Sequence, residues 1–231
     1  MCIRDSVYPT RSNKEAKYLK ASIRSVAKLY PDAEIVIIGN KPSWLRRCTH
    51  IQFNEKALSK PYINVWNKML IACNKFNEPF IWMNDDFILN TPFSWEDSQM
   101  YYKDLAYRKT GVSEGNFYSI RINRTFSLLE GMKLGNECYD IHQPMIIDPS
   151  VIKWMNYHLK MIDNAYLFKT IYGQVTKSAY KQYEYSHCKI NSMDDFLEDM
   201  VYFSTSDKWN NEDLKKLNAL FPEKCIFEKS R

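Results

Sequence analysis

The stretch that decides the fold is FIWMNDDFIL, residues 80–89. Apolar, strand-favouring residues flank three small polar ones, of which Asp85 and Asp86 are acids. Such a short run, rich in β-forming residues, predicts a buried strand rather than a helix. Two carboxylates in mid-strand would cost several kcal/mol unless a cation or hydrogen-bond donors met them. We therefore expect the strand to end at the acids and to deliver them to its carboxyl edge, where open α/β sheets bind ligands.

A βαβ unit precedes this stretch. Val7 and Tyr8 end a first strand, which Pro9 stops. Asn13 is expected to cap a helix whose apolar residues recur at helical spacing from position 18 to 30. Residues 34–39 (EIVIIG) then form a continuous apolar strand of the kind that parallel sheets bury on both faces. Together these elements predict an open, mostly parallel α/β sheet flanked by helices.

The remaining elements are assigned from shorter patterns. We expect a strand at 50–53, a helix at 64–73, a strand at 118–122 and a helix at 125–133. A β-like run covers 139–148, Pro149 begins a helix over 151–159, and a last helix opens at Trp209 and ends at Pro222. The acidic pair Asp194–Asp195 is interpreted as a charge pair at a helix start. The 231 residues are predicted to form a single domain.

Composition narrows the function classes. Only 6 glycines are present, without a Gly-rich phosphate loop, and the 6 cysteines are scattered without metal-ligand spacing. The net charge of +5 is compatible with a polyanionic partner but does not require one. Because we find no signal peptide and no apolar run long enough to span a bilayer, we expect a cytoplasmic protein without a membrane partner. Residues 1–6 are polar where a strand should begin; the sequence does not tell whether they are native, and we place no weight on them.

The two acids that follow the strand, Asp85 and Asp86, suggest a binding site for a hard divalent cation. Mg²⁺ and Mn²⁺ take carboxylate oxygens and bridge them to the oxygens of a diphosphate. The alternative is a strand that ends in solvated acids, which is the commoner meaning of an isolated Asp-Asp pair.

Several blocks, in this order along most of the chain, resemble a known family. The sequence is similar to the Stealth-type sugar-phosphate transferases, and more so to the short phage and bacterial glycosyltransferases related to them, including those associated with oxidised-base DNA modification. The blocks are 19–25 (LKASIRS), 41–45 (KPSWL), 64–67 (NVWN), 83–87 (MNDDF), 139–145 (YDIHQPM), 168–173 (FKTIYG), 203–207 (FSTSD) and 221–228 (FPEKCIFE). The chain departs from the family at Asp140, where Glu is more usual, at Lys169 for Arg and at Cys225 for Ser. The opening Val-Asp of the Stealth enzymes is replaced by Tyr8-Pro9-Thr10, which weakens the phosphotransferase interpretation.

The resemblance implies a GT-A-like fold with a UDP-sugar donor and a Mn²⁺ or Mg²⁺ cofactor. It divides the chain into a nucleotide-sugar-binding half at about 7–93 and an acceptor-side half at about 94–231. It implies Asp86 as a metal ligand, His142 as a second metal ligand or a group at the reacting sugar, and Asp140 as the general base of an inverting reaction. Asp140 and His142 would face the same side of a strand. The donor-contact residues that it implies are Tyr8, Pro9, Thr10, Arg11, Lys41, Asn64, Asn67, Asn84 and Asp85.

The sequence leaves three functions open. The first is transfer of a hexose to 5-hydroxymethylcytosine or another 5-hydroxymethylpyrimidine in DNA, as in phage DNA hypermodification, with the base flipped into a pocket. Lysines and tyrosines interleaved around Tyr180, Tyr183 and Tyr185 could provide a stacking surface for it, although an aromatic core edge has the same pattern. The second is a Stealth-like sugar-phosphate or surface-polysaccharide transferase, and the third a non-catalytic module that binds nucleic acid or sugar. Donor sugar, stereochemistry and oligomeric state are not encoded in any pattern that we recognise.

Overall fold

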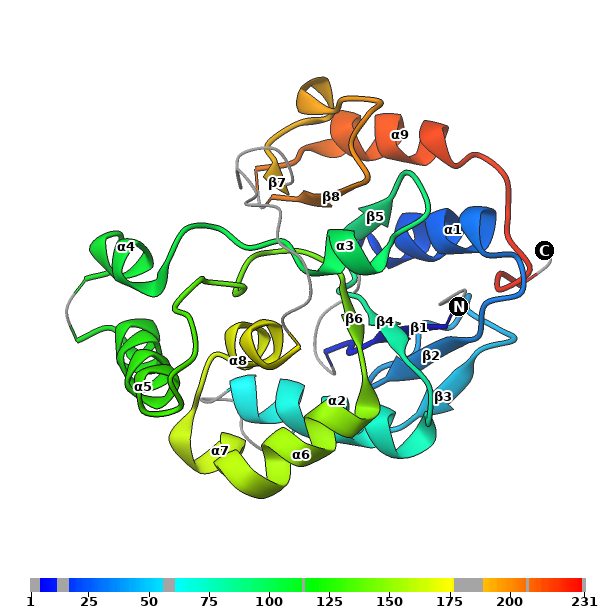
Figure 1. The fold of residues 1–231 in the computed structure, drawn as a ribbon. Coiled ribbons are helices and arrows are strands. Elements are labelled where there is room, and N and C mark those ends of the chain that lie inside the picture. The colour runs from blue at the N-terminus through cyan, green and yellow to red at the C-terminus, as the bar shows by residue number, and fades with distance from the viewer. Residues whose placement is uncertain are drawn as a thin grey trace.

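A five-stranded sheet forms the centre of the protein in the computed structural model, which describes residues 5–11, 17–55, 61–113, 115–176, 189–206 and 208–229 (Figure 1). The strand order is β3-β2-β1-β4-β6. Four strands are parallel and β6 runs antiparallel to β4. The strands are β1 (Ser6–Tyr8), β2 (Ile35–Ile38), β3 (Thr49–Ile51), β4 (Phe80–Trp82) and β6 (Met145–Ile147). The predicted fold class, an open and mostly parallel α/β sheet flanked by helices, is confirmed.

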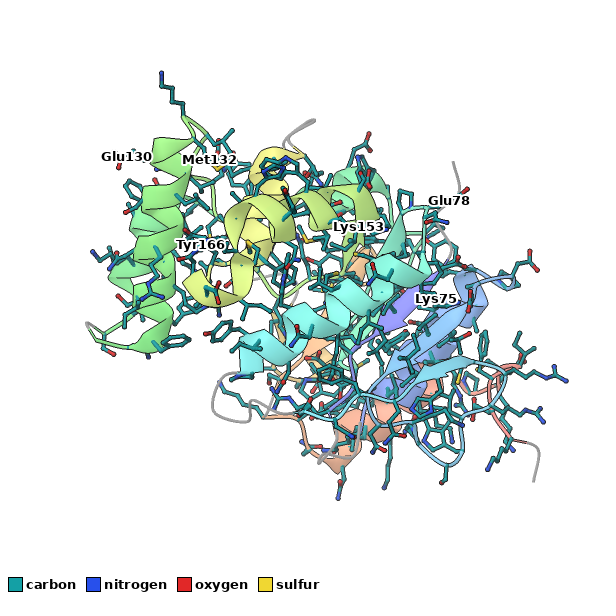
Figure 2. All side chains as sticks on the ribbon, turned by 90° about the horizontal axis from the view of Figure 1, so that it is seen from below. Lys75, Glu78, Glu130, Met132, Lys153 and Tyr166 are labelled. Atoms are coloured by element: carbon teal, nitrogen blue, oxygen red, sulfur yellow. The ribbon has the colours of Figure 1, made fainter. Side chains whose placement is uncertain are left out.

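Helices cover both faces of this sheet. α1 (Leu19–Leu29) packs on one face, where Ile35 and Ile37 of β2 point. α2 (Pro61–Lys75) and α6 (Pro149–Leu159) pack on the other, toward Val36 and Ile38. Figure 2 shows the molecule from the side of these two helices, with Lys75 on α2 and Lys153 on α6 labelled. Burial on both faces explains why β2 reads as a continuous apolar run rather than an alternating one.

A second, three-stranded sheet lies beyond α1. It has the order β5-β8-β7, with β5 (Phe87–Leu89), β8 (Tyr202–Thr205) and β7 (Lys189–Ile190). α9 (Asn211–Leu220) packs against this sheet and α1 through a separate apolar cluster. The run 80–89 is therefore two strands in two sheets, and the acids occupy the turn that joins them.

Local patterns misled the assignment between residues 117 and 148. The strand predicted at 118–122 is wrong, because these residues belong to α5 (Phe117–Gly131), whose first turn the side chain of Asn116 caps. The β-like run 139–148 contains only β6, and bends cover 141–143.

Other helices agree with the sequence. The helices predicted after Pro149 and before Pro222 are confirmed as α6 and α9. Asn13, the predicted cap of the first helix, lies outside the described residues. The other helices are α3 (Trp95–Ser98), α4 (Leu105–Thr110), α7 (Met161–Asn164) and α8 (Phe168–Val175).

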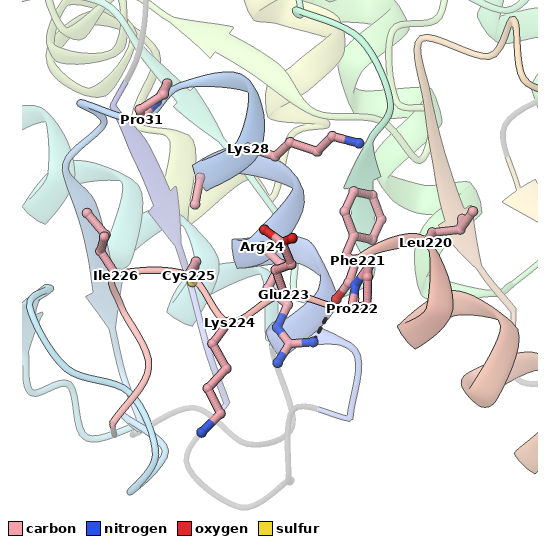
Figure 3. Close-up of a pocket in the computed structure, with 11 residues that line it drawn as sticks. Arg24, Lys28, Pro31, Leu220, Phe221, Pro222, Glu223, Lys224, Cys225 and Ile226 are labelled. Carbon is pink, nitrogen blue, oxygen red and sulfur yellow. Dashed lines mark hydrogen bonds between the residues drawn. The ribbon is translucent and has the colours of Figure 1, made fainter. Parts of the chain in front are cut away.

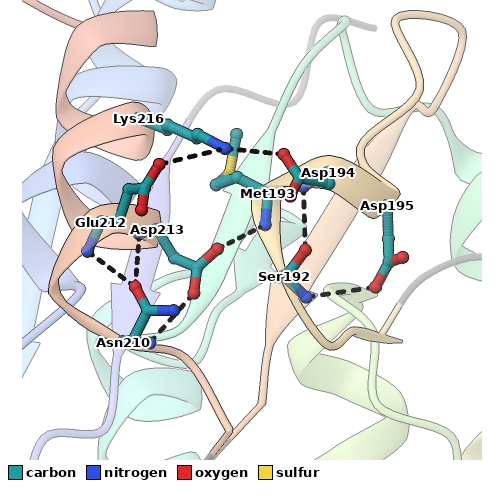
Figure 4. Close-up of polar contacts among 8 residues, drawn as sticks. All are labelled: Ser192, Met193, Asp194, Asp195, Asn210, Glu212, Asp213 and Lys216. Atoms are coloured by element: carbon teal, nitrogen blue, oxygen red, sulfur yellow. Dashed lines mark hydrogen bonds and ion pairs between the residues drawn. The ribbon is translucent and has the colours of Figure 1, made fainter.

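The acidic pair Asp194–Asp195 has the structural role expected from the sequence (Figure 4). It sits in a short 3₁₀ turn, Met193–Asp195, where Ser192 and Asp195 form a reciprocal capping box. Asp194 Oδ1 forms an ion pair with Lys216 Nζ of α9 at 2.6 Å. Backbone N–H groups and a lysine thus satisfy both carboxylates.

None of the described helices is both long enough and apolar enough to cross a bilayer.

Candidate active site

The strand order gives the expected position of a ligand-binding crevice, which is at the carboxyl ends of β1 and β4. From β1 the chain moves to β2 and β3 on one side, and then returns to β4 on the other. The loops that leave two such strands turn to opposite faces of the sheet, which opens a crevice between them where ligands bind. The loop 9–11 and the turn 84–86 flank that crevice. Because β6 is antiparallel to β4, with Met145 paired to Trp82, the segment before β6 arrives at the same edge.

Asp86 is held in the turn between the two sheets. The turn closes with a hydrogen bond from Phe87 N–H to Asn84 C=O at 3.3 Å, and the carbonyl of Asp86 accepts from Thr205 N–H of β8 at 3.3 Å. Burial, followed by the charge of the neighbouring Asp85, raises the pKa of the Asp86 carboxyl to about 7. A carboxylate that ionises this reluctantly without a ligand is suited to receive a cation.

His142 faces Asp86 from the segment before β6. Its Nε2 lies 3.5 Å from Asp86 Oδ2, and its Nδ1 lies 2.9 Å from Ser204 Oγ on β8. The imidazole packs nearly perpendicular to the Phe87 ring, with the ring centroids 4.8 Å apart. Burial, followed by the charges of Lys169 and Lys189, lowers the pKa of His142 to about 3. The ring is therefore a neutral imidazole at physiological pH, the form that binds metals.

The sequence Asp86, His142, Ser204 has the order of a nucleophilic triad, but its geometry does not suit one. Ser204 has no solvent-exposed surface, so a substrate cannot reach its Oγ. A hydroxyl on Nδ1 instead fixes the orientation of the ring, as outer-shell groups do for metal-binding histidines. We therefore assign Ser204 to positioning His142.

Asp140 and His142 contact different elements. Asp140 Oδ2 accepts a 2.7 Å hydrogen bond from the Tyr118 hydroxyl on α5, whereas His142 contacts the second sheet. The expectation that the two residues share one side of a strand is wrong, because residues 139–142 are not a strand. Burial and the nearby Asp140 raise the pKa of Tyr118, so its hydroxyl stays protonated and can donate.

The loop after β1 is built from the main chain. Tyr8 is fully buried in the core, and its hydroxyl contacts Ser22 Oγ at 3.1 Å, so only its backbone can meet a ligand. Thr10 is 4% exposed and donates through Oγ1 to Asn40 C=O at 2.7 Å. A Cβ on Gly39 would lie 2.1 Å from Thr10 O, and Gly39 has φ of +127°. Glycine is therefore required at 39 for the two loops to meet.

A buried lysine supports the same loop from below. Lys68 of α2 is 2% exposed and donates to Thr10 C=O and to Glu55 Oε1, each at 2.7 Å. Asn64 lies one turn before it on the same face of α2 and is also buried. Because α2 follows the parallel strand β3, its first turn lies at the carboxyl edge of the sheet.

The other implied donor contacts are more accessible. Pro9, Asn67, Asn84 and Asp85 are partly exposed, and Arg11 is exposed beside the crevice. The ammonium of Lys41 is already bonded to Leu45 C=O at 3.1 Å within its own loop.

The donor set at Asp86 fits a cation that arrives with a phosphate ligand. Among the described residues no three His, Cys, Asp or Glu side chains come together as a complete metal site. Asp86 and His142 supply one carboxylate oxygen and one neutral imidazole nitrogen, and Asp85 adjoins them in sequence. Mg²⁺ and similar ions typically take one or two protein carboxylates and complete their coordination with substrate phosphates and water. The pair thus suits Mg²⁺ or Mn²⁺ held jointly with a diphosphate.

Sequence analysis missed the residues that support the site, namely Lys68, Lys169, Ser204 and Tyr118. For Lys68 a signal existed. Position 68 lies three residues after Val65 and four before Ala72, which places it on the inward stripe of the predicted helix. Lys169 and Ser204 lie in blocks that resemble the family, but no pattern indicated a supporting role for either of them or for Tyr118.

A separate surface cavity of about 490 Å³ lies between α1 and the segment 220–226 (Figure 3). Arg24 on its wall is already committed, since it donates to Glu228 at 2.6 Å and to Phe221 C=O at 2.7 Å. None of the candidate site residues lines this cavity, and we assign it no part in the chemistry.

Comparisons with known proteins give structural likeness only. No protein-family model matches the chain, and no curated protein matches it. Among solved structures, the chain is similar to the glycosyltransferase GlyE of Streptococcus pneumoniae, with 10% identity and a TM-score of 0.39 over 79% of this chain and 45% of that one. It is also similar to the galactosyltransferase LgtC in complex with donor and acceptor sugar analogues, with 14% identity and a TM-score of 0.40 over 94% and 95% of the two chains. The chain spans under half of the GlyE structure, and at these TM-scores we base no functional conclusion on either likeness.

Proposed function

We propose that the protein is a metal-dependent glycosyltransferase that moves a hexose from a UDP-sugar to a hydroxyl acceptor. One observation carries the proposal. Asp86 and His142, far apart in the sequence, meet at 3.5 Å at the carboxyl edge of the sheet, beside the crevice between β1 and β4. A partly buried carboxyl whose pKa is raised to about 7 costs stability when it is ionised, and a bound cation would offset that cost.

The proposed reaction replaces one bond to the anomeric carbon by another. The acceptor oxygen attacks this carbon, the bond to the diphosphate oxygen breaks, and UDP leaves with the electron pair. A divalent ion, when bound, neutralises the charge that grows on the leaving diphosphate. Asp86 and His142 would hold that ion, while Asn84 and Asp85 would meet the ribose or sugar hydroxyls.

Base and ribose recognition is assigned to the loop after β1. Its contribution is mainly backbone, because Tyr8 and Thr10 are buried, and the exposed Arg11 can pair with a phosphate. Lys41, Asn64 and Asn67 are secondary donor contacts in this proposal. Lys68 would keep the loop in place by holding Thr10 C=O.

Asp140 is our candidate for the general base of an inverting reaction. It lies at the same edge, and the Tyr118 hydroxyl orients its carboxylate through Oδ2. In that role Asp140 accepts the proton of the acceptor hydroxyl as the new bond forms. A retaining reaction would not need this base, so Asp140→Asn separates the two stereochemical courses.

For the acceptor we propose 5-hydroxymethylpyrimidine in DNA, with a cytoplasmic location. The net charge of +5 supports a polyanionic acceptor. The tyrosines proposed to stack on a flipped base, Tyr180, Tyr183 and Tyr185, lie outside the described residues.

Donor turnover tests the proposal. The protein is incubated with Mn²⁺, a panel of UDP-sugars, and DNA with or without 5-hydroxymethylcytosine, and the digested nucleosides are weighed. We expect UDP release and a hexose added to the modified base, both lost in Asp86→Ala. UDP release with unmodified DNA would refute the DNA acceptor, and UMP release would indicate a sugar-phosphate transferase. Binding of DNA or sugar without turnover of any donor would indicate a non-catalytic module.

A further inference from the structure

A buried lysine on α8 holds the segment that carries His142. Lys169 is 8% exposed, and its Nζ donates to Ile141 C=O at 3.0 Å and to Gln143 C=O at 2.9 Å. These two carbonyls belong to the residues on either side of His142. Nζ also lies 5.6 Å from the centre of the Phe87 ring, against which the His142 ring packs nearly perpendicular.

The rest of α8 is fastened to the same segment. Thr170 Oγ1 accepts from Tyr139 N–H at 3.2 Å, and Gln174 donates to Glu137 C=O at 3.1 Å. A Cβ on Gly173 would lie 2.3 Å from the Tyr139 ring, so the helix and the segment are in tight contact. Residues 169–174 of α8 are all buried. The helix is therefore a rigid internal support rather than a surface element.

The surroundings of Lys169 differ from those of an ordinary core lysine. Buried ammonium groups are usually paired with a carboxylate, as Lys68 is with Glu55 at 2.7 Å. In the described part of the chain, no carboxylate lies within ion-pair distance of Lys169, although Asp86 and Asp140 are close enough to act on its charge. Its direct hydrogen-bond partners are the two carbonyls, both neutral and both next to His142.

From this geometry we propose that Lys169 is the positioning residue for His142. By clamping the carbonyls of Ile141 and Gln143 it fixes the backbone on both sides of the histidine, and so aims Nε2 at Asp86 while Nδ1 stays on Ser204. The consequence for metal-assisted transfer rests on the function proposed above. The orientation of the His142 ring does not depend on that function, and it can be measured in the metal-free protein.

The test is the imidazole ¹⁵N spectrum of metal-free protein at one fixed pH. Four histidines contribute, and the His142 signals are those lost in His142→Gln. We expect well-separated Nδ1 and Nε2 signals in the wild type, as a single tautomer gives. Lys169→Met should move them toward the averaged values of a free ring. Lys68→Met, which removes a buried lysine that contacts another loop, should leave them in place.

Unchanged His142 signals in Lys169→Met, or equal changes in both lysine variants, would overturn the proposal. If Lys169→Met does not fold, Lys169→Gln keeps an uncharged N–H donor group on a shorter side chain and should give an intermediate shift. Unchanged signals in that variant would overturn the proposal equally. In the Mn²⁺ dependence of donor hydrolysis, Lys169→Met should raise the half-saturating Mn²⁺ concentration about tenfold, the lower range for lost outer-shell support. A wild type without donor hydrolysis would refute the proposed function, while the ring signals would still decide the role of Lys169.

Discussion

Two Asp-Asp pairs occur in this chain, and their surroundings are opposite. Asp195 accepts backbone N–H groups in a capping box, and Asp194 pairs with Lys216 on the surface. Asp86 lies in a partly exposed turn, and in the described ranges its carboxylate lies 3.5 Å from the neutral ring of His142 and makes no ion pair with a lysine or arginine. The first pair is satisfied by the fold itself. The second leaves negative charge at a sheet edge without a counter-ion in contact, which is the arrangement expected of a ligand site.

The largest expected effect is on turnover. Asp86→Ala should lower Mn²⁺-dependent donor hydrolysis about 10³-fold, because it removes a carboxylate that holds the cation. Asp195→Ala should stay within about threefold of the wild type, because a capping residue acts only on local stability. Steady-state UDP release on both variants measures the contrast. Equal losses in the two variants would mean that the pairs do not differ as described.

The next largest expected effect is on the pH dependence of stability, to which Asp86 should contribute. The pKa of Asp86 is raised from 3.8 to about 7 in the folded state, so its stabilising contribution is complete below pH 4 and is lost as pH rises through 7. Metal-free Asp86→Asn should therefore melt higher than the wild type at pH 8, by on the order of 5 °C, and this difference should shrink toward pH 4. Thermal unfolding at several pH values checks it. A variant less stable than the wild type at pH 8 would contradict a costly carboxylate at this position.

The smallest effect is expected at Asp194–Asp195, the pair whose carboxylates already have hydrogen-bond and ion-pair partners. Asp195→Ala breaks the capping box with Ser192 and should lower the free energy of unfolding by about 1 kcal/mol. Urea unfolding at neutral pH measures this loss. Glu223→Ala, an exposed acid near the surface cavity, is a matched control that should change the same quantity by less than about 0.5 kcal/mol. An increase in stability on removing Asp195 would show that this acid too is held at a cost.

The sequence predicted the first part of the fold and the position of its acids. The continuous apolar run at 34–39 and the helical spacing before it define a βαβ unit from local patterns alone, and Asp85–Asp86 follow directly from the end of the apolar run. The strand predicted at 118–122 was wrong because Tyr-Ser-Ile-Arg-Ile alternates like a strand. The cap at Asn116 and the packing of α5 make this segment a helix. Alternation over five residues cannot outweigh such tertiary contacts.

The geometry of the candidate site was only half predictable. Asp86 and His142 were each singled out, but their meeting depends on the antiparallel direction of β6 and on β8 reaching β5 from much later in the chain. Neither pairing has a local signature. Lys169 was noted only as a replacement for an Arg of the similar family. Its buried position has no sequence signal, since a lysine in a short helix is normally solvated, and only the burial of α8 reveals its contacts.

The most direct test of the central claim is UDP binding measured by calorimetry with Mn²⁺ and with chelator. A cation shared between Asp86, His142 and the diphosphate predicts that UDP binds at least tenfold more tightly with Mn²⁺ than without it. The same comparison in Asp86→Asn should show little or no gain from the metal. Equal UDP affinity with and without Mn²⁺ in the wild type, or no UDP binding at all, would contradict the account of this edge as a metal–diphosphate site.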